Sequence, residues 1–113
     1  MIYIKGMRKS MKLAELLKDV PYLKIEGSTE RPVEAMYYDS RKVTPRSLFF
    51  CIQGFTVDGH DYAPQAVEKG SHVLVLEKDV SVEKDVTKVF VEDSRKAMAF
   101  MARNFYGNPG SNV

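Results

Sequence analysis

Polar side chains gather in two short stretches of the sequence, each beside a predicted buried strand. Asp39-Ser40-Arg41 follows an apolar and aromatic segment, and residues 53–60 follow the apolar run 48–52. A serine hydroxyl and backbone N–H can meet a ligand oxygen, and an arginine can pair with a phosphate. Because α/β proteins bind ligands outside the carboxyl ends of their strands, the two stretches predict one pocket for a polar ligand.

The same Asp-Ser-Arg triplet occurs a second time, at Asp93-Ser94-Arg95. There it opens a strongly periodic helical stripe, so helix capping by Asp93 or Ser94 explains it fully. The first copy can likewise be read as a capping or turn serine, either with Arg41 on the surface or with Asp39 and Arg41 paired to fix the loop. The ligand-binding interpretation of the first copy depends on its context, a loop and a further strand in place of a helix.

The second polar stretch adds a glycine turn. Gly54 permits close backbone approach or a positive φ. Phe55 can stack on a flat base or plug the core. His60 and His72 are too few for a metal site, so we expect none. Cys51 lies in the apolar strand, which predicts an inert core thiol.

The sequence offers no set of catalytic residues. No nucleophile–base pair stands out, and neither a G-x-x-x-x-G-K-[ST] phosphate loop nor a G-x-G-x-x-G dinucleotide fingerprint is present. These absences favour binding over chemistry.

Hydrophobic patterning predicts the elements that position these residues. We expect strands at 33–38, 48–52, 73–76 and within 88–92; helices at 11–18 (ended by Pro21), 62–69 and from Asp93 or Ser94 to Gly107; and loops at 24–32 and 39–47. Pro64 fits the first turn of the second helix, and Gly70 its left-handed end. Strand, helix and strand from 48 to 76 form a βαβ unit, which indicates the α/β class.

Size and charge narrow the function classes. The 113 residues suit one domain, and no apolar run is long enough to cross a bilayer. A single cysteine fits a reducing cytoplasm. Residues 1–12 hold four basic side chains and no acidic one, which leaves 13 basic against 15 acidic side chains elsewhere. The body of the domain is therefore not basic, which argues against a nucleic-acid partner.

Taken together, the motifs resemble a known family. The residues that carry the resemblance are Asp39-Ser40-Arg41, Ser47-Leu48-Phe49-Phe50, Gly54, Asp58-Gly59-His60, Lys69-Gly70 and Asn104-Phe105-Tyr106-Gly107-Asn108-Pro109. In this order they resemble the amino-terminal domain of the Mur ligases, above all of those that add diaminopimelate or lysine. The resemblance implies a small Rossmann-like domain with a mixed sheet flanked by helices.

The resemblance also implies a domain plan and partners. Residues 1–10 would be an N-terminal extension, 11–107 the UDP-substrate-binding domain, and 108–113 the start of a linker to an ATP-binding domain. Such ligases act on UDP-N-acetylmuramoyl-L-alanyl-D-glutamate in peptidoglycan precursor synthesis, and their central and C-terminal domains bring ATP, Mg²⁺ and the incoming amino acid. The chain itself would then need no cofactor and would not catalyse alone.

Site residues follow position by position. Tyr38 and Ser40 match the family's uridine-diphosphate contacts, and Phe55, Thr56 and Val57 match the turn that lines the uracil pocket. Asp39, Arg41 and Gly54 belong to the same motifs. Some relatives carry more polar side chains at 55 and 56, so backbone contacts are expected to persist there and side-chain contacts are open.

Two other functions remain to be weighed. One is a stand-alone α/β regulatory or protein-interaction module, with Phe55 and Tyr62 as exposed anchors. The other is a freestanding enzyme, which the missing phosphate loop disfavours.

Overall fold

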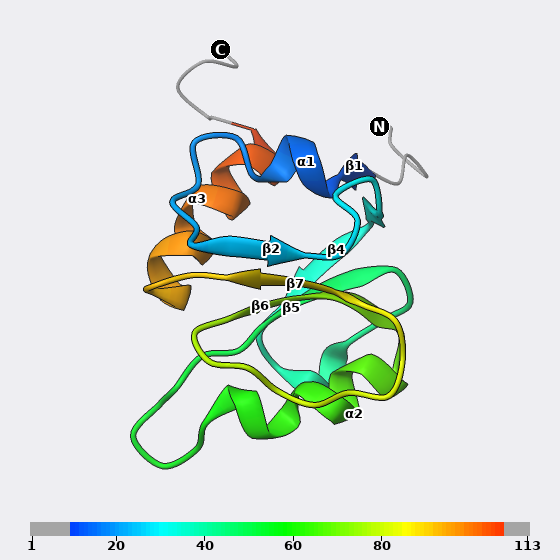
Figure 1. Ribbon diagram of the computed structural model, residues 1–113, viewed down its shortest axis with the longest axis vertical. Coiled ribbons are helices and arrows are strands. Elements are labelled where there is room, and N and C mark those ends of the chain that lie inside the picture. Colours follow the sequence, from blue (N-terminus) through cyan, green and yellow to red (C-terminus); the bar gives the residue numbers. More distant parts are fainter. Residues whose placement is uncertain (1–9, 108–113) are drawn as a thin grey trace.

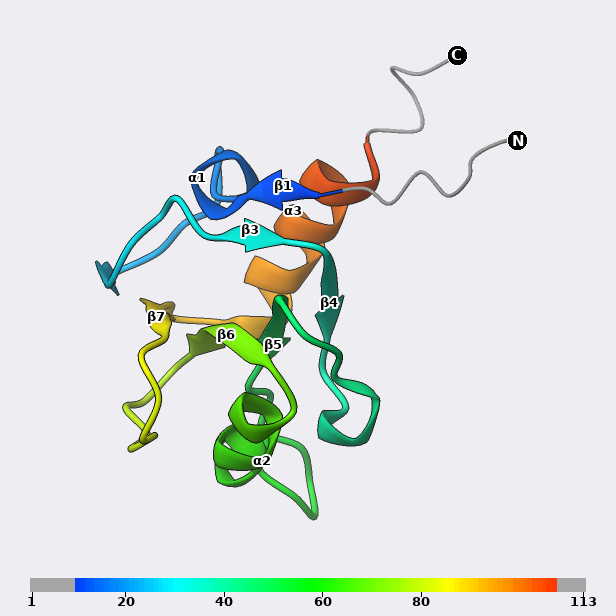
Figure 2. The same ribbon diagram turned by 90° about the vertical axis from the view of Figure 1, so that its right-hand side faces the viewer.

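The computed structural model describes residues 10–107 and shows a mixed five-stranded sheet between two layers of helices (Figure 1). The elements are β1 (Met11–Lys12), α1 (Leu13–Leu16), β2 (Lys24–Glu26), β3 (Pro32–Val33), β4 (Ala35–Tyr37), β5 (Ser47–Phe50), α2 (Ala63–Glu68), β6 (Ser71–Leu76), β7 (Thr87–Phe90) and α3 (Ser94–Tyr106), with short 3-10 helices η1 (Ser40–Lys42) and η2 (Gly59–Tyr62). Figure 2 shows α1 and α3 on one side of the sheet and α2 on the other. The predicted α/β class is confirmed.

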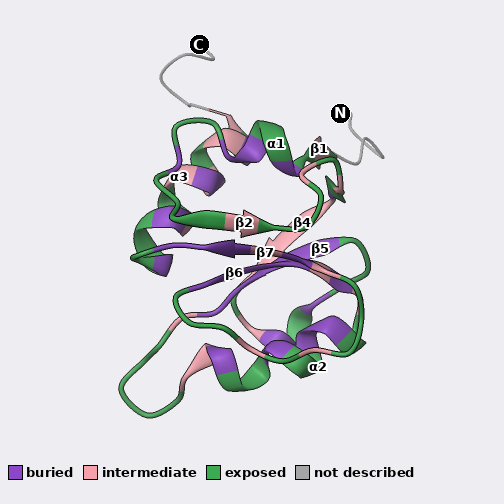
Figure 3. Cartoon of the chain, in the orientation of Figure 1, coloured by how far each residue is buried: buried purple, intermediate pink, exposed green. Residues whose placement is uncertain are grey.

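The sheet has the order β2-β7-β6-β5-β4, in which β4, β5, β6 and β7 run parallel and β2 runs antiparallel at the edge. Its central strands are buried on both faces (Figure 3). Leu48 and Phe50 of β5 pack in the core under α1 and α3, whereas Phe49 and Cys51 pack in the core under α2. Successive side chains of a strand point to opposite faces, so the continuous apolar run serves both cores.

The predicted βαβ unit forms from β5, α2 and β6. Pro64 lies in the first turn of α2, where its missing N–H leaves no bond unmade. Gly70 ends the helix with φ of 115°, and a Cβ there would lie 2.6 Å from Cα of Pro45. Both the left-handed conformation and the close approach require glycine at this position.

Helix α3 packs its apolar stripe on the sheet as predicted. Asp93 is its N-cap, and its carboxylate accepts the N–H of Lys96 at 3.1 Å. Buried positions include Ala97, Met101 and Phe105. The stripe is therefore a core face.

The first predicted helix is wrong in its bounds. Residues 13–16 are helical, but Met11 and Lys12 form a strand that pairs antiparallel with β3. The helix ends before Pro21, because Leu17 is its C-cap and Asp19 adopts φ of 64°.

The prediction of a loop at 24–32 is also wrong, because this range contains β2 and the first residue of β3. Strand β2 has three residues, and its only apolar side chain is Ile25, so it shows too little alternation to be recognised. The strand is formed by its pairing with β7, which the local sequence of β2 does not indicate. The strand expected at 33–38 is divided at Glu34 between β3 and β4.

The predicted linker (108–113) lies outside the described residues, and so does the predicted extension (1–10) except for Ser10. Among the described residues, no helix has the length and apolar character that crossing a bilayer requires.

Candidate functional site

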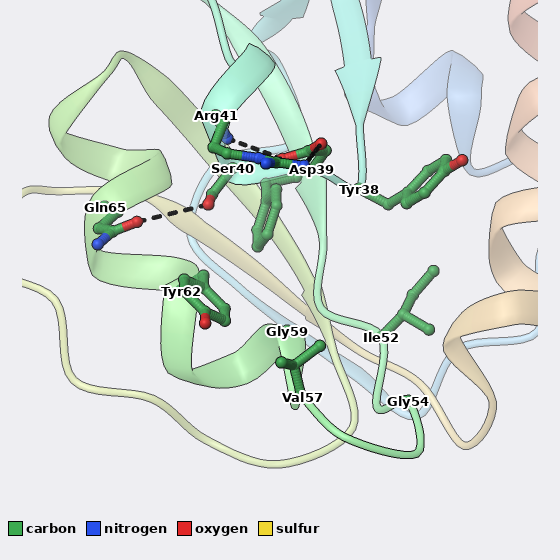
Figure 4. Close-up of a pocket in the computed structure, with 11 residues that line it drawn as sticks. Tyr38, Asp39, Ser40, Arg41, Ile52, Gly54, Val57, Gly59, Tyr62 and Gln65 are labelled. Carbon is green, nitrogen blue, oxygen red and sulfur yellow. Dashed lines mark hydrogen bonds and ion pairs between the residues drawn. The ribbon is translucent and has the colours of Figure 1, made fainter.

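A pocket of about 560 Å³ opens beside the segments that follow β4 and β5 (Figure 4). The residues that line it are Tyr38, Asp39, Ser40, Arg41, Phe49, Ile52, Gly54, Val57, Gly59, Tyr62 and Gln65. They come from the η1 turn, from β5 and the turn after it, and from η2 and α2. The two polar stretches predicted to meet at this edge of the sheet do meet there.

The η1 turn is held by a tight ion pair. The Asp39 carboxylate accepts three hydrogen bonds from Arg41: from its backbone N–H and its Nε at 3.0 Å each, and from its Nη2 at 2.8 Å. Hydrogen bonding to the Arg41 side chain and backbone lowers the pKa of Asp39 to about 2. The predicted pairing of Asp39 with Arg41 is confirmed, and it neutralises the arginine locally.

Ser40 lies between this pair and α2. It is 7% exposed, and its Oγ donates to Oε1 of Gln65 over 3.5 Å. One helical turn later, Nζ of Lys69 donates to the carbonyl oxygen of Arg41 at 3.3 Å. Residues four apart on a helix lie on the same face, so Gln65 and Lys69 both face η1.

The turn after β5 closes on itself through backbone bonds. The N–H of Gly54 donates to the carbonyl of Val57 at 2.7 Å, and that of Gly59 to the carbonyl of Ile52 at 2.8 Å. A Cβ on Gly59 would lie 2.6 Å from N of Ile52. Any other residue at 59 would therefore force the pocket wall apart.

Asp58 and His60 stabilise this turn through hydrogen bonds with each other and with neighbouring residues. The Asp58 carboxylate accepts the N–H of His60 at 3.0 Å, its Nδ1–H at 2.7 Å, and Nζ of Lys78 at 2.7 Å. The pKa of Asp58 is held well below its usual range, chiefly by Lys78. Nε2 of the buried His60 accepts the N–H of Glu77 at 2.9 Å, which places the ring proton on Nδ1. Both ring nitrogens of His60 are therefore engaged within the protein.

The predicted site residues divide into two groups. Tyr38, Asp39, Ser40, Arg41, Gly54 and Val57 all line the pocket. Phe55 and Thr56 do not; they line an adjoining hollow that shares Gly54, Val57 and Tyr62 with the pocket. Phe55 is fully exposed, so it does not plug the core.

Sequence reasoning missed Phe49, Ile52 and Gln65 as lining residues, and it considered Tyr62 only as an anchor for a partner. The signal available for Gln65 was its place on the helix that follows β5, since the turn after β5 lines the pocket.

The pocket has a polar end and an apolar end (Figure 4). Ser40 and Gln65 lie at one end, and Ile52 and Tyr38 lie toward the other. Burial raises the pKa of the nearby Cys51 thiol to about 12, so it is no nucleophile. Among the described residues, no group of three His, Cys, Asp or Glu could hold a metal ion. The arrangement suits a ligand with a flat ring at one end and oxygen acceptors at the other.

Comparisons with known proteins identify the family. Residues 32–106 match the family described as "Mur ligase family, catalytic domain". Over 103 residues the chain is 45% identical to the UDP-N-acetylmuramoyl-L-alanyl-D-glutamate–2,6-diaminopimelate ligase of Alkaliphilus metalliredigens, covering 91% of this chain and 21% of the relative. It is 50% identical over 99 residues to the enzyme of the same name in Geobacillus thermodenitrificans, covering 88% and 20%.

Solved structures agree on the fold. MurF from Acinetobacter baumannii superposes with a TM-score of 0.71 at 18% identity, over 85% of this chain and 21% of the other. The chain spans about a fifth of the length of the relatives that it matches. Since the family match covers most of the described residues, the chain belongs to the Mur ligase family and forms its amino-terminal domain.

Proposed function

We propose that residues 11–107 bind the UDP part of UDP-N-acetylmuramoyl-L-alanyl-D-glutamate. The domain would serve an ATP-dependent ligase of peptidoglycan precursor synthesis. One observation carries the proposal: Tyr38, Ser40 and Val57, which match the family's UDP contacts, line a single pocket. The names of the relatives, which are diaminopimelate-adding ligases, support the same substrate.

The polarity of the pocket suits UDP. We assign uracil and ribose to the end lined by Tyr38, Ile52 and Val57, and the diphosphate to the end at Ser40. Phe55 and Thr56 lie on the adjoining hollow, so we assign them to the rim, where Phe55 can cover the base. Gly54, which lines both hollows, lets a ligand approach the backbone closely.

The chemistry of the parent enzyme lies elsewhere in its chain. In the proposed reaction, the substrate carboxylate takes a phosphoryl group from ATP, and an amine of diaminopimelate or lysine then displaces phosphate to form the amide. The central and C-terminal domains supply ATP, Mg²⁺ and the amino acid. This domain contributes substrate binding and orientation only, in the cytoplasm, and alone it is expected to be inactive.

Calorimetric titration of the 113-residue chain with UDP and with ATP tests the proposal. We expect weak, saturable UDP binding, because the missing domains complete the site, and no comparable response to ATP. Equal heats for both nucleotides, or none for UDP at millimolar concentration, would contradict it.

A second function is favoured by one observation, the full exposure of Phe55 beside the half-exposed Tyr62. A protein-interaction module would present such aromatic anchors to a partner. Capture of a partner that Phe55→Ala abolishes, with no effect of UDP, would support this function over nucleotide binding.

A further inference from the structure

We propose that Gln65 is a further binding residue: its side-chain amide donates a hydrogen bond to a phosphate oxygen of the nucleotide and holds the Ser40 hydroxyl beside that oxygen. This inference rests on the proposed function and deepens it. It assigns a diphosphate subsite to the polar end of the pocket, built by α2 as well as by the Asp39-Ser40-Arg41 turn.

The first support is the contact that Gln65 makes in the free domain. Oγ of Ser40 and Oε1 of Gln65 lie 3.5 Å apart, longer than the roughly 2.5–3.0 Å of a good O–H···O bond. Among the described residues, Nε2 of Gln65 has no hydrogen-bond partner. The Ser40 hydroxyl is therefore held by one long contact and the exposed Gln65 amide N–H groups have no protein partner among the described residues, so one ligand oxygen can engage both.

The second support is the charge of the pocket. Among the described residues that line it, Arg41 alone has a cationic side chain, and two of its guanidinium nitrogens donate to Asp39. The Asp39–Arg41 pair has no net charge, since the carboxylate is held ionised. Because Asp39 already holds two of the three guanidinium nitrogens, neutral donors can add to what Arg41 offers a phosphate, and Ser40 and Gln65 provide them.

The third support is the rigidity of the helix that carries Gln65. Ala63, Ala66 and Val67 anchor α2 in the core beneath it. Lys69 ties the end of the helix to the carbonyl of Arg41. The Gln65 side chain thus projects from a fixed backbone toward Ser40 (Figure 4), as a preorganised binding group must.

Two variants separate binding from mere positioning. Gln65→Glu keeps an oxygen that accepts from Ser40 but replaces the N–H donors with a negative charge. Gln65→Leu removes both the acceptor and the donors. A matched control is Ser81→Glu, which adds the same charge near α2. Ser81 does not line the pocket; it lines a second hollow, to which Gln65 also contributes.

The test titrates the wild-type chain and each variant with uridine, UMP and UDP, after thermal unfolding confirms that each variant folds. We expect Gln65→Glu to bind uridine as the wild type does and UDP at least about tenfold more weakly. Gln65→Leu should lose UDP affinity as well, and Ser81→Glu should lose much less.

The outcomes separate the two proposals. If the wild type binds UDP and Gln65→Glu binds it equally well, the inference about Gln65 is overturned and the proposed function stands. An equal loss for uridine and UDP would reduce Gln65 to a structural residue and also overturn the inference. Failure of the wild type to bind UDP would overturn the proposed function itself.

Discussion

The two Asp-Ser-Arg triplets share a sequence and a capping role but differ in what their serines face. Asp39 and Asp93 are both N-caps whose carboxylates accept backbone N–H groups, of Arg41 and Lys96 respectively. The hydroxyl of Ser40 faces a pocket and the amide of Gln65. That of Ser94 is fully buried and has no hydrogen-bond partner among the described residues.

The difference comes from the elements that follow each triplet. A 13-residue helix follows Asp93 and covers the sheet, so Ser94 is sealed in the interior. Only a three-residue 3-10 turn follows Asp39, and the chain then turns back into β5, which leaves the strand ends open. The same tripeptide thus becomes a helix start in one place and a pocket wall in the other.

The largest expected effect separates the two serines by binding. Ser40→Ala should weaken UDP binding about tenfold, because a hydrogen bond to a charged oxygen is lost. Ser94→Ala should leave UDP binding unchanged. Its free energy of unfolding should stay the same or rise by up to about 1 kcal/mol, because a buried unpaired hydroxyl is removed. Calorimetric titration and urea unfolding measure the two effects. Equal loss of UDP binding in both variants would show that Ser40 has no special role in the pocket.

The next effect separates the two aspartates by stability. Asp93→Ala removes the cap of the long helix and should lower the free energy of unfolding by about 1 kcal/mol. Asp39 caps only a short exposed turn, so Asp39→Ala should lower the free energy of unfolding less. The same variant should weaken UDP binding, because the turn is no longer held in place. Urea unfolding of both variants gives the comparison; a larger stability loss for Asp39→Ala would reverse it.

The smallest effect concerns the pH dependence of the first triplet. The pKa of Asp39, about 2 in the folded state, is below its ordinary value of 3.8. The stability from its pairing with Arg41 is therefore present above about pH 3.8 and is lost as the pH falls toward 2. Arg41→Gln should return the carboxyl pKa toward 3.8, as followed by carboxyl carbon NMR. An unchanged pKa in that variant would show that Arg41 is not its cause.

Sequence patterns anticipated the elements that have strong periodicity. The run at Leu48 predicted a strand covered on both faces, and α3 was predicted from its stripe and its cap. Strand β2 was missed because one half-buried Ile25 between two charged residues carries almost no pattern, and its identity depends on pairing with distant β7.

The site was predictable in its backbone turns but not in its full lining. Motif resemblance brought Ser40 and Val57 together correctly at one edge of the sheet. Gln65 was missed because it occupies an exposed helical position in no motif, and only the packing of α2 against η1 turns it toward Ser40. The choice between core and surface for Phe55 likewise needed the closed geometry of the turn after β5.

The most direct test of a UDP-binding pocket is an NMR titration of the 113-residue chain with UDP, reading the backbone amides of both triplets. We expect saturable shifts at Ser40 and in the turn from Gly54 to Gly59, and no shift at Ser94. Saturable shifts centred on Ser94, or none at Ser40 at millimolar UDP, would contradict it.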